Sequence, residues 1–308
     1  MAAPVMHWDD VPGRRRGGGH LGGTWHDLGR AIGAVDVGLR RILLPPGTWS
    51  TPAHRHLAEE EIHFLLAGDG ISWQDGEAFE VRAGDCLVHL AGAEAHTLRA
   101  GPNGLDVLAF GERVAPGSTA IPRAAVAWHG TTWIEAGVGP NPFERDEALG
   151  PPDVPDLSPR PARILNLDAV ADKRFGQGER VRAVRRDLGR EAGSVRTGLS
   201  HVEVAPGAWN APAHCHAAEE ELFVVLAGDG VLELGNEEHP VRPGSIVSRP
   251  PGTGVAHAFR AGPRGLTLLA YGNRKPHDMT YYPRSDKVYL RGLRLIGRIE
   301  RLDYWDGE

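Results

Sequence analysis

Short apolar runs alternate with turn signals along the whole chain, and long amphipathic stretches are few. Residues 62–67 (IHFLLA) and 222–227 (LFVVLA) are two such runs, and the turn sequence Gly-Asp-Gly directly follows each of them. Runs of this length that end at a turn are typical of buried β-strands. Helices are expected only near residues 143–149 and 167–173. The pattern favours a closed antiparallel barrel or jelly roll, so the predicted fold class is all-β.

The chain contains a long internal repeat. Residues 52–70 (PAHRHLAEEEIHFLLAGDG) match residues 212–230 (PAHCHAAEEELFVVLAGDG), an offset of 212 − 52 = 160. After one inserted residue, HTLRAGPNGL at 96–105 matches HAFRAGPRGL at 257–266. A repeat of this length is a whole domain rather than a solenoid unit. We therefore expect two tandem domains that are related by an approximate twofold axis.

The boundaries of the two domains follow from the repeat and from composition. Residues 5–139 form the first domain with a trailing segment, and residues 164–308 form the second domain with a C-terminal segment. The segment between them, 140–163, is rich in proline and acidic residues, which is typical of an extended linker. A chain of 308 residues is long enough for two domains that each bury a core.

Composition and charge narrow the classes of partner. The formal net charge of −6, from 34 basic and 40 acidic residues, does not indicate the basic surface that nucleic-acid binding requires. No run of about 18 apolar residues occurs, so no membrane span is expected. The two cysteines require no oxidising compartment, and the N-terminal residues do not resemble a secretory signal. We therefore expect a cytoplasmic protein that acts on a small molecule without nucleic acid or membrane partners, and we leave open whether it forms a homodimer.

Each repeat carries three histidines and one glutamate in the same order. His54 and His56 lie two residues apart on one face of an expected strand, Glu61 opens the next strand, and His96 comes from a distant strand. Three imidazoles and one carboxylate suit a divalent metal ion, and iron, manganese, nickel, copper, cobalt and zinc are all compatible. Because the whole set occurs twice, we predict one ion in each domain. The expected ligands are His54, His56, Glu61 and His96 in the first domain, and His214, His216, Glu221 and His257 in the second.

The glycines around these ligands carry a resemblance to a known family. The first motif of the cupin family is matched by Gly47, His54, His56, Glu61 and Gly68, and again by Gly207, His214, His216, Glu221 and Gly228. The second cupin motif is looser, because Leu90 replaces a proline and the gap before each motif's histidine is longer than in the family. The chain resembles a bicupin. The resemblance implies two tandem cupin double-stranded β-helix (jelly-roll) barrels, each with a mononuclear metal centre.

The cupin spacing also selects one glutamate from each run of three. Its six-residue step to a glycine selects Glu61 from Glu59-Glu60-Glu61, and Glu221 from the matching run. The remaining glutamates are expected to face solvent or to form hydrogen bonds at the rim of the barrel.

The two sites differ in the residue that follows the glutamate ligand on the interior face. Alternation along the strand places His63 beside the first metal site and Phe223 at the matching position of the second. Histidine titrates near neutrality, so His63 is the candidate general acid or base; a buried histidine that only forms hydrogen bonds is the alternative. Trp73, further along the same strand, is expected either to close the first pocket or to belong to the core.

Three functional hypotheses remain. Cupins with this ligand set frequently catalyse oxygen-dependent ring or C–C cleavage, so the resemblance implies a dioxygenase-type oxidoreductase that acts on a small organic substrate. The second hypothesis is a non-redox isomerase, lyase or decarboxylase that uses the metal as a Lewis acid, although no lid-loop signature supports decarboxylation of the oxalate type. The third is a non-catalytic cupin that binds or senses a small ligand. The more polar first site is preferred for chemistry, and whether the second site is also catalytic is left open.

Overall fold

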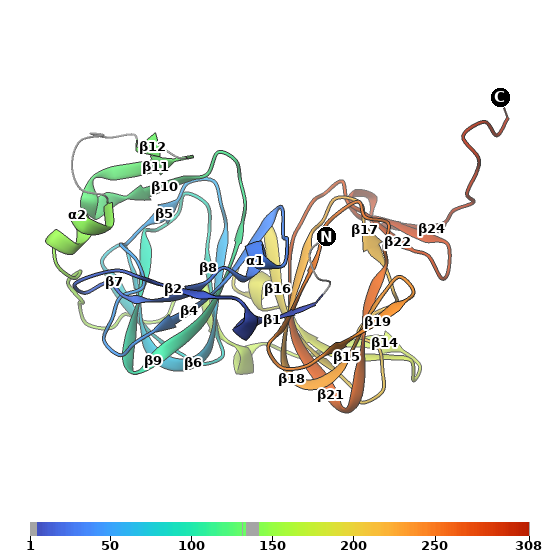
Figure 1. Cartoon of the computed structure of the whole chain (residues 1–308), viewed down its shortest axis with the longest axis horizontal. Coiled ribbons are helices and arrows are strands. Elements are labelled where there is room, and N and C mark those ends of the chain that lie inside the picture. Colours follow the sequence, from blue (N-terminus) through green and yellow to red (C-terminus); the bar gives the residue numbers. More distant parts are fainter. Residues whose placement is uncertain (1–4, 131, 134–141, 308) are drawn as a thin grey trace.

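Two β-barrels lie side by side in the computed structural model, which describes residues 5–130, 132–133 and 142–307 (Figure 1). The strands up to the middle of the chain are β1 (Met6–His7), β2 (Gly13–Arg16), β3 (Gly23–His26), β4 (Val37–Leu44), β5 (Arg55–His56), β6 (Glu61–Gln74), β7 (Glu77–Arg82), β8 (Asp85–His89), β9 (His96–Glu112), β10 (Ser118–Ile121), β11 (Val126–His129) and β12 (Thr132–Trp133). Those that follow are β13 (Ile164–Asn166), β14 (Lys173–Gln177), β15 (Val181–Arg186), β16 (Thr197–Val204), β17 (Cys215–His216), β18 (Glu221–Leu234), β19 (Glu237–Val241), β20 (Ser245–Arg249), β21 (His257–Asn273), β22 (Met279–Tyr282), β23 (Lys287–Leu290) and β24 (Leu295–Arg298).

Each barrel combines one large sheet with one four-stranded sheet. The large sheet has the order β13-β8-β6-β9-β4-β3-β2 in the first barrel and β1-β20-β18-β21-β16-β15-β14 in the second, with β7 and β19 paired to β6 and β18. The smaller sheets have the orders β12-β11-β10-β5 and β17-β22-β23-β24. All strand pairs between named strands are antiparallel in the described part of the chain. The prediction of an all-β fold with two tandem barrels is confirmed.

Helices are short and few, as the sequence predicts. The α-helices are α1 (Leu28–Ala31), α2 (Pro142–Ala148) and α3 (Leu188–Glu191), and the 3-10 helices are η1 (Trp8–Asp10), η2 (Pro122–Ala124), η3 (Leu167–Ala169) and η4 (Arg291–Leu293). The helix expected near residues 143–149 is therefore present as α2. The one expected near residues 167–173 is only the single turn of η3, and a strand begins at Lys173.

Both faces of β6 are buried near its start, which explains why apolar residues occur on both faces there. Ile62 and Phe64 belong to an apolar cluster between the barrels, to which both halves of the chain contribute. Leu65 belongs to a second cluster inside the first barrel. The matching strand β18 is also buried on both faces, because Leu222 lies in the layer between the barrels and Phe223 lies inside the second barrel. A strand with two buried faces does not need the polar alternation of a half-exposed strand.

A bulge in the middle of β6 changes which side chains face the barrel interior. The pairing of β6 with β9 shifts register between Leu65 and Gly70. Within the bulge, Gly68 has a φ of +88°, and a Cβ atom there would lie 2.0 Å from the carbonyl oxygen of Gly104. Beyond the bulge, the side chain of Trp73 lies outside the barrel, and its Nε1 donates to the carbonyl oxygen of Asp153 at 3.1 Å. The expectation that Trp73 closes the first pocket or joins the core is wrong, because simple alternation does not continue through a bulge.

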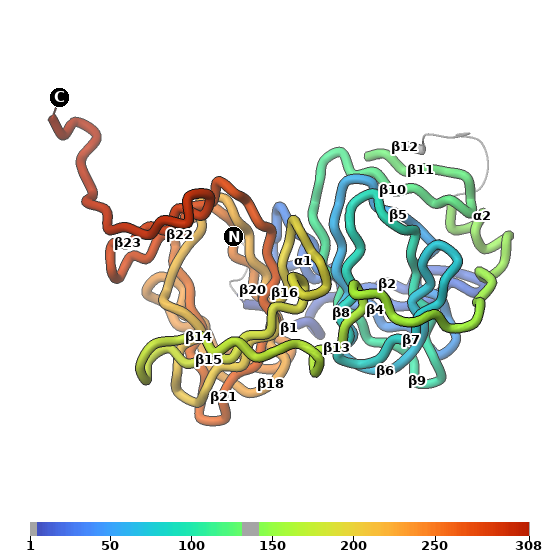
Figure 2. The backbone as a smooth tube through the Cα atoms, turned by 180° about the vertical axis from the view of Figure 1, so that it is seen from behind, coloured from blue at the N-terminus to red at the C-terminus, as the bar shows by residue number. Residues whose placement is uncertain are grey.

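The two halves of the chain exchange their outermost strands. β1, from the N-terminal end, pairs with β20 of the second barrel, whereas β13 pairs with β8 of the first barrel. Both crossings are visible from behind in Figure 2. The predicted limit between residues 139 and 140 lies outside the described residues. The boundaries 5–139, 140–163 and 164–308 stay a prediction drawn from the sequence repeat, and the hydrogen-bonded sheets cross them.

Reciprocal contacts show the approximate twofold relation between the repeats. The carboxylate of Glu60, which is 1% exposed, accepts hydrogen bonds from the backbone N–H groups of Val195, Arg196 and Thr197 at 2.9, 3.3 and 3.0 Å. The hydroxyl of Ser194 donates to the same carboxylate at 2.6 Å. These donors belong to the loop that follows α3 of the second domain and to the first residue of β16.

Glu220 makes the equivalent contacts in the opposite direction. Its carboxylate is fully buried and accepts from the N–H groups of Val35, Asp36 and Val37 at 2.9, 2.5 and 3.0 Å. The expectation that these glutamates face solvent or lie at the rim is wrong for Glu60 and Glu220. Adjacent side chains on a strand point to opposite faces, so the residue before each ligand glutamate points into the neighbouring domain.

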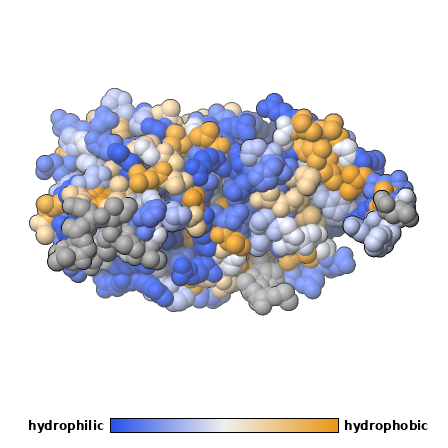
Figure 3. Space-filling model, turned by 90° about the horizontal axis from the view of Figure 1, so that it is seen from above, coloured by the Kyte–Doolittle hydropathy of each residue, from blue (hydrophilic) through white to orange (hydrophobic). Residues whose placement is uncertain are grey.

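The outer surface mixes hydrophilic and hydrophobic residues. Seen from above, hydrophobic residues gather on the half of the molecule formed by the second domain (Figure 3). Exposed apolar side chains in and before its last strand include Leu293, Leu295 and Ile296. No helix among the described residues is long and apolar enough to cross a membrane. Homodimer formation stays an open prediction.

We expect the Glu60→Gln variant to lose about 3 kcal/mol of unfolding free energy, because an amide leaves part of the buried donor set without an acceptor. Burial alone would raise the pKa of Glu60, but hydrogen bonds from Ser194 and Thr197 outweigh it and lower that pKa. The carboxylate's contribution is therefore fully present above the ordinary glutamate pKa and is lost as the pH falls through the lowered folded value. Urea unfolding between pH 3 and pH 7 measures both effects.

The control for this experiment is Glu80→Gln, a change of an exposed residue on β7. It should alter the unfolding free energy by less than about 0.5 kcal/mol. Equal stability of Glu60→Gln and the unmodified protein across the pH range would show that the interface does not depend on this carboxylate.

Candidate metal centres

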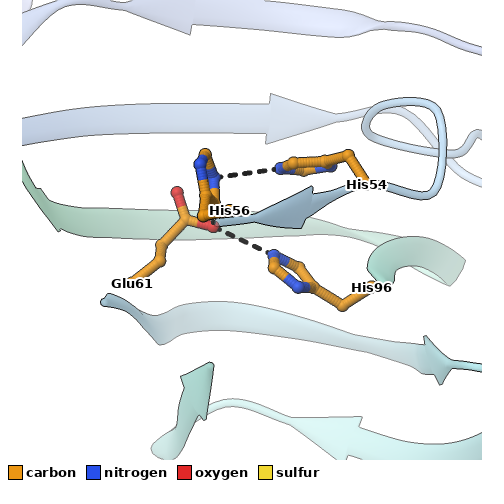
Figure 4. A group of neighbouring side chains, drawn as sticks. All are labelled: His54, His56, Glu61 and His96. Carbon is orange, nitrogen blue, oxygen red and sulfur yellow. Dashed lines mark hydrogen bonds and ion pairs between the residues drawn. The ribbon is translucent and has the colours of Figure 1, made fainter. Parts of the chain in front are cut away.

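The four expected ligands of the first domain converge inside its barrel (Figure 4). His54 precedes β5 and forms an isolated bridge with His96 at the start of β9, while His56 lies on β5 and Glu61 begins β6. The Nε2 atoms of His54 and His56 are 3.2 Å apart. Oε2 of Glu61 lies 3.1 Å from Nε2 of His96 and 3.7 Å from Nε2 of His56. Residues that are far apart in the sequence thus form one compact donor group.

The second domain repeats this arrangement. His214 and His257 form the same isolated bridge, His216 lies on β17, and Glu221 begins β18. Oε2 of Glu221 lies 3.9, 3.3 and 3.0 Å from the Nε2 atoms of His214, His216 and His257. The four side chains of the first domain form one donor group, whereas in the second domain His214, Glu221 and His257 form the compact group and His216 lies between Glu221 and a second group with Glu219 and Asp278. The role of the eight predicted residues as ligands stays a prediction.

The free donor atoms fit a metal ion. Oε2 of Glu221 and the Nε2 atoms of His216 and His257 are buried, and none has a hydrogen-bond partner among the described residues. A buried carboxylate oxygen and two imidazole nitrogens that face one another, with no further partner, need a shared proton or a cation between them. With metal–ligand bonds of about 2.1 Å, ligand atoms at right angles are roughly 3.0 Å apart. The closest observed separations, 3.0 Å in the second domain and 3.1 Å in the first, match this spacing.

Hydrogen bonds on the far side of the rings direct the Nε2 atoms inward. Nδ1 of His54 lies 3.0 Å from the carbonyl oxygen of Pro52, and Nδ1 of His214 lies 2.9 Å from that of Pro212. A carbonyl oxygen can only accept, so each Nδ1 carries the proton and each Nε2 presents a lone pair to the centre. This tautomer is the one that binds a metal through Nε2.

Burial and charge move the pKa values of these histidines in opposite directions. Burial places the pKa of His54 well below its ordinary value and lowers that of His214 to about 4. Burial also opposes the charged form of His56 and His216, but the adjacent carboxylates outweigh it and raise both pKa values to about 10. One imidazole in each centre, that of His56 or His216, is therefore protonated on both nitrogens at neutral pH. An incoming ion must displace one of these protons, so acid weakens metal binding.

His63 lies beside the first centre, as alternation along β6 predicts. It is 6% exposed, and its Nε2 lies 3.1 Å from Oε2 of Glu61. The role of His63 as an acid or base stays a prediction. A further histidine at this centre, His89, belongs to no motif in the sequence. Its ring stacks on that of His96 at 3.6 Å, and its Nδ1 lies 2.9 Å from Glu94. His89 is directly opposite Glu61 in the pairing of β6 with β8, and only this pairing could have revealed it.

The cavities at the two centres differ in size and lining. An inner cavity of about 70 Å³ in the first barrel is lined by the ligands together with His63, and a neighbouring cavity of about 240 Å³ includes His56 and Glu61. Arg40 lines both cavities. The second centre opens into a cavity of about 330 Å³, whose lining includes Tyr282 and Arg291. Arg40 could not be selected from the sequence, because a single arginine on a strand belongs to no motif.

Comparisons with known proteins agree with this geometry. The family profile described as the cupin domain matches residues 40–104 and 200–267, one match in each repeat. An oxalate-binding protein of Thermotoga maritima is 36% identical over 70 residues, which cover 22% of this chain and 56% of that protein. An uncharacterised protein of Methanocaldococcus jannaschii is 38% identical over 53 residues, which cover 17% of this chain and 42% of that protein. These alignments span about half the length of each curated relative.

Solved structures share the two-barrel fold. The oxalate decarboxylase of Lactobacillus farciminis, in a formate complex, aligns with a TM-score of 0.60 and 14% identity over 90% of this chain and 88% of that chain. The Bacillus subtilis oxalate decarboxylase at pH 4.6 aligns with a TM-score of 0.58 and 16% identity over 88% of this chain and 76% of that chain. At this level of identity the likeness shows the fold alone.

Both repeats are cupin domains, and the chain is a bicupin. Each domain carries a histidine and glutamate donor set that suits one divalent metal ion.

We expect the unmodified protein to bind two manganese ions per chain and the His54→Ala and His214→Ala variants to bind one each, because each change removes one of four ligands. The measurement is elemental analysis after manganese loading and desalting. His239→Ala changes a histidine outside both centres and should leave two ions bound. Two ions in either ligand variant would contradict the assignment of that histidine.

Proposed function

We propose that this bicupin is a metal-dependent enzyme that cleaves a small carboxylate substrate at the metal centre of its first domain. The observation that carries the proposal is Arg40. Its side chain shares a face of β4 with Ile42 and Leu44 and lines both cavities at the centre. No other described residue forms an ion pair or hydrogen bond with it. A free guanidinium group beside a metal site is suited to pair with a carboxylate.

The size of the inner cavity supports a small substrate. At about 70 Å³, this cavity has room for only a few non-hydrogen atoms beside the ligands. The similarity of 70 residues to an oxalate-binding protein supports the same class of ligand, a short dicarboxylate. The sequence alone gave no reason to prefer this class over other small organic molecules.

The residues around the first centre divide the chemical tasks. A bound divalent ion would supply positive charge that stabilises negative charge developing on the substrate. Arg40 would orient the substrate carboxylate from the opposite side, and the apolar side chains of Ile42, Leu44 and Leu98 would keep water from the inner cavity. His63, which lines the same cavity, would accept or donate the proton.

Oxygen dependence decides the reaction class within this proposal. The dioxygenase prediction requires oxygen uptake in step with substrate cleavage. The non-redox alternative, decarboxylation or lyase chemistry, releases carbon dioxide or another fragment without oxygen uptake. Both use the same ligands and the same carboxylate pairing.

The proposal can be tested with protein loaded with manganese or iron(II) and offered oxalate and other two- to four-carbon carboxylates. Carbon dioxide release and oxygen uptake are followed under air and under nitrogen. Cleavage of one of these compounds supports the proposal, and the amount of oxygen taken up per substrate cleaved assigns the reaction class. Tight binding by calorimetry without turnover under either condition would instead identify a non-catalytic binding protein.

Arg40→Ala should raise KM at least 10-fold and change kcat little, because a charge-assisted hydrogen bond to the substrate contributes about 1.5–3 kcal/mol. Arg40→Lys should restore part of the loss by keeping the charge. Steady-state kinetics measure both constants, with Arg15→Ala on the exposed strand β2 as control. An unchanged KM in Arg40→Ala would remove the main support for a carboxylate substrate.

His63→Phe introduces the residue that the second domain carries at the matching position, Phe223. We expect kcat to fall about 10²–10⁴-fold while metal content stays at two ions per chain, because the change removes a proton-transfer group and no predicted ligand. Kinetics and elemental analysis on the same preparation test this. Full activity would assign His63 a packing role, and loss of one ion would assign it to metal binding.

A further inference from the structure

The two metal centres differ in what supports one of their histidines. Nδ1 of His216 lies 2.8 Å from Oδ2 of Asp278, a fully buried carboxylate. Asp278 directly precedes β22, the strand that pairs with β17, which carries His216. Since a carboxylate at this distance accepts the Nδ1 proton, Nε2 of His216 is left to face the centre.

Other donors fix the position of Asp278. Its Oδ1 accepts hydrogen bonds from the backbone N–H groups of Ala218 at 2.9 Å and Glu219 at 3.2 Å. Its Oδ2 also accepts from the hydroxyl of Thr280 at 3.4 Å. Ala218 and Glu219 lie between His216 and Glu221 in the sequence. One carboxylate therefore fixes both the ring of a ligand and the loop that leads to the next ligand.

The first domain lacks this support. Thr119 of the first repeat matches Thr280 of the second, an offset of 280 − 119 = 161. By this offset, the residue of the first repeat that matches Asp278 is Gly117. Among the described residues, Nδ1 of His56 has only longer contacts, 3.3 Å to Oε2 of Glu59 and 3.3 Å to Oγ1 of Thr119. Neither contact has the length of a strong charge-assisted hydrogen bond.

The residue that matches Glu59 has a different partner in the second domain. Glu219 is 3.8 Å from Nδ1 of His216 and forms an ion pair with Arg291. The position that matches Arg291 in the first domain is Gly130, by the same offset of 161. In the second domain, Asp278 thus takes the place beside the histidine that Glu59 has in the first. Glu219, which matches Glu59, pairs with Arg291 instead.

We propose that Asp278 is a positioning residue that fixes His216 for metal binding, so that the second domain releases its ion more slowly than the first. A metal-binding histidine whose Nδ1 proton is taken by a carboxylate is oriented in advance and is a stronger donor at Nε2. The first centre, with weaker support at His56, exchanges its ion faster. This inference does not depend on the substrate proposed above.

The experiment uses the full chain loaded with cobalt(II) and mixed with excess chelator, and the absorbance of the released complex is followed over time. We expect two phases. His257→Ala removes a ligand of the second centre and should abolish the slow phase, whereas His96→Ala removes the matching ligand of the first and should abolish the fast phase. Persistence of the slow phase in His257→Ala overturns the proposal.

The second part of the experiment tests Asp278 itself. Asp278→Asn should speed the slow phase by roughly 10–100-fold and leave the fast phase unchanged, and Asp278→Glu should restore part of the slow release. The matched variant Glu59→Gln should leave the slow phase unchanged. Circular dichroism and the cobalt absorption bands of each variant show whether it folds with metal bound. A folded Asp278→Asn protein with unchanged slow release, or with both phases changed equally, overturns the proposal. If this variant does not fold, Asp278→Glu tests the residue, and the His96 and His257 variants test which centre releases its ion slowly.

Discussion

Consecutive side chains on a β-strand point to opposite faces, and the organisation of this bicupin depends on that constraint at the start of β6 and β18. Glu60 points outward and accepts hydrogen bonds from backbone N–H groups of the second domain, while Glu61, the next residue, points inward to the first metal centre. Glu220 and Glu221 divide the same tasks in the second domain. A shift of one residue in the pairing of either strand would exchange the interface residue with the ligand, so register is fixed from both sides.

The same two strands therefore form both the interface between the domains and part of each metal centre. Ile62 and Phe64 continue the outward series into the apolar layer between the barrels, where the equivalent residues Phe110 and Tyr271 have ring centroids 4.9 Å apart. Contact between equivalent residues marks the approximate twofold axis. Each centre is therefore built on a strand whose outer face is held by the other domain, which limits how far its ligands can move apart.

The features that could be predicted from the sequence are those encoded by short spacing and repeated in both halves. The barrel fold and the convergence of the eight predicted ligands belong to this group, because an HxH pair, a glutamate and a distant histidine recur in register. Trp73 was misplaced because the bulge at Gly68 cannot be read from alternation alone. Asp278 and His89 were missed for a related reason. Each contacts its partner through pairing or a turn that brings together residues with no fixed spacing in the sequence.

The exchange of β1 and β13 has a consequence for how such a chain could arise. Each of these strands leaves its own half to complete the sheet of the other, and each enters at the equivalent edge, beside β20 or β8. The same exchange between two separate copies of a one-repeat subunit would give a symmetric dimer with crossed N-terminal strands. Gene fusion would then have preserved a quaternary contact inside one polypeptide and freed each half to diverge, as the different surroundings of His56 and His216 show.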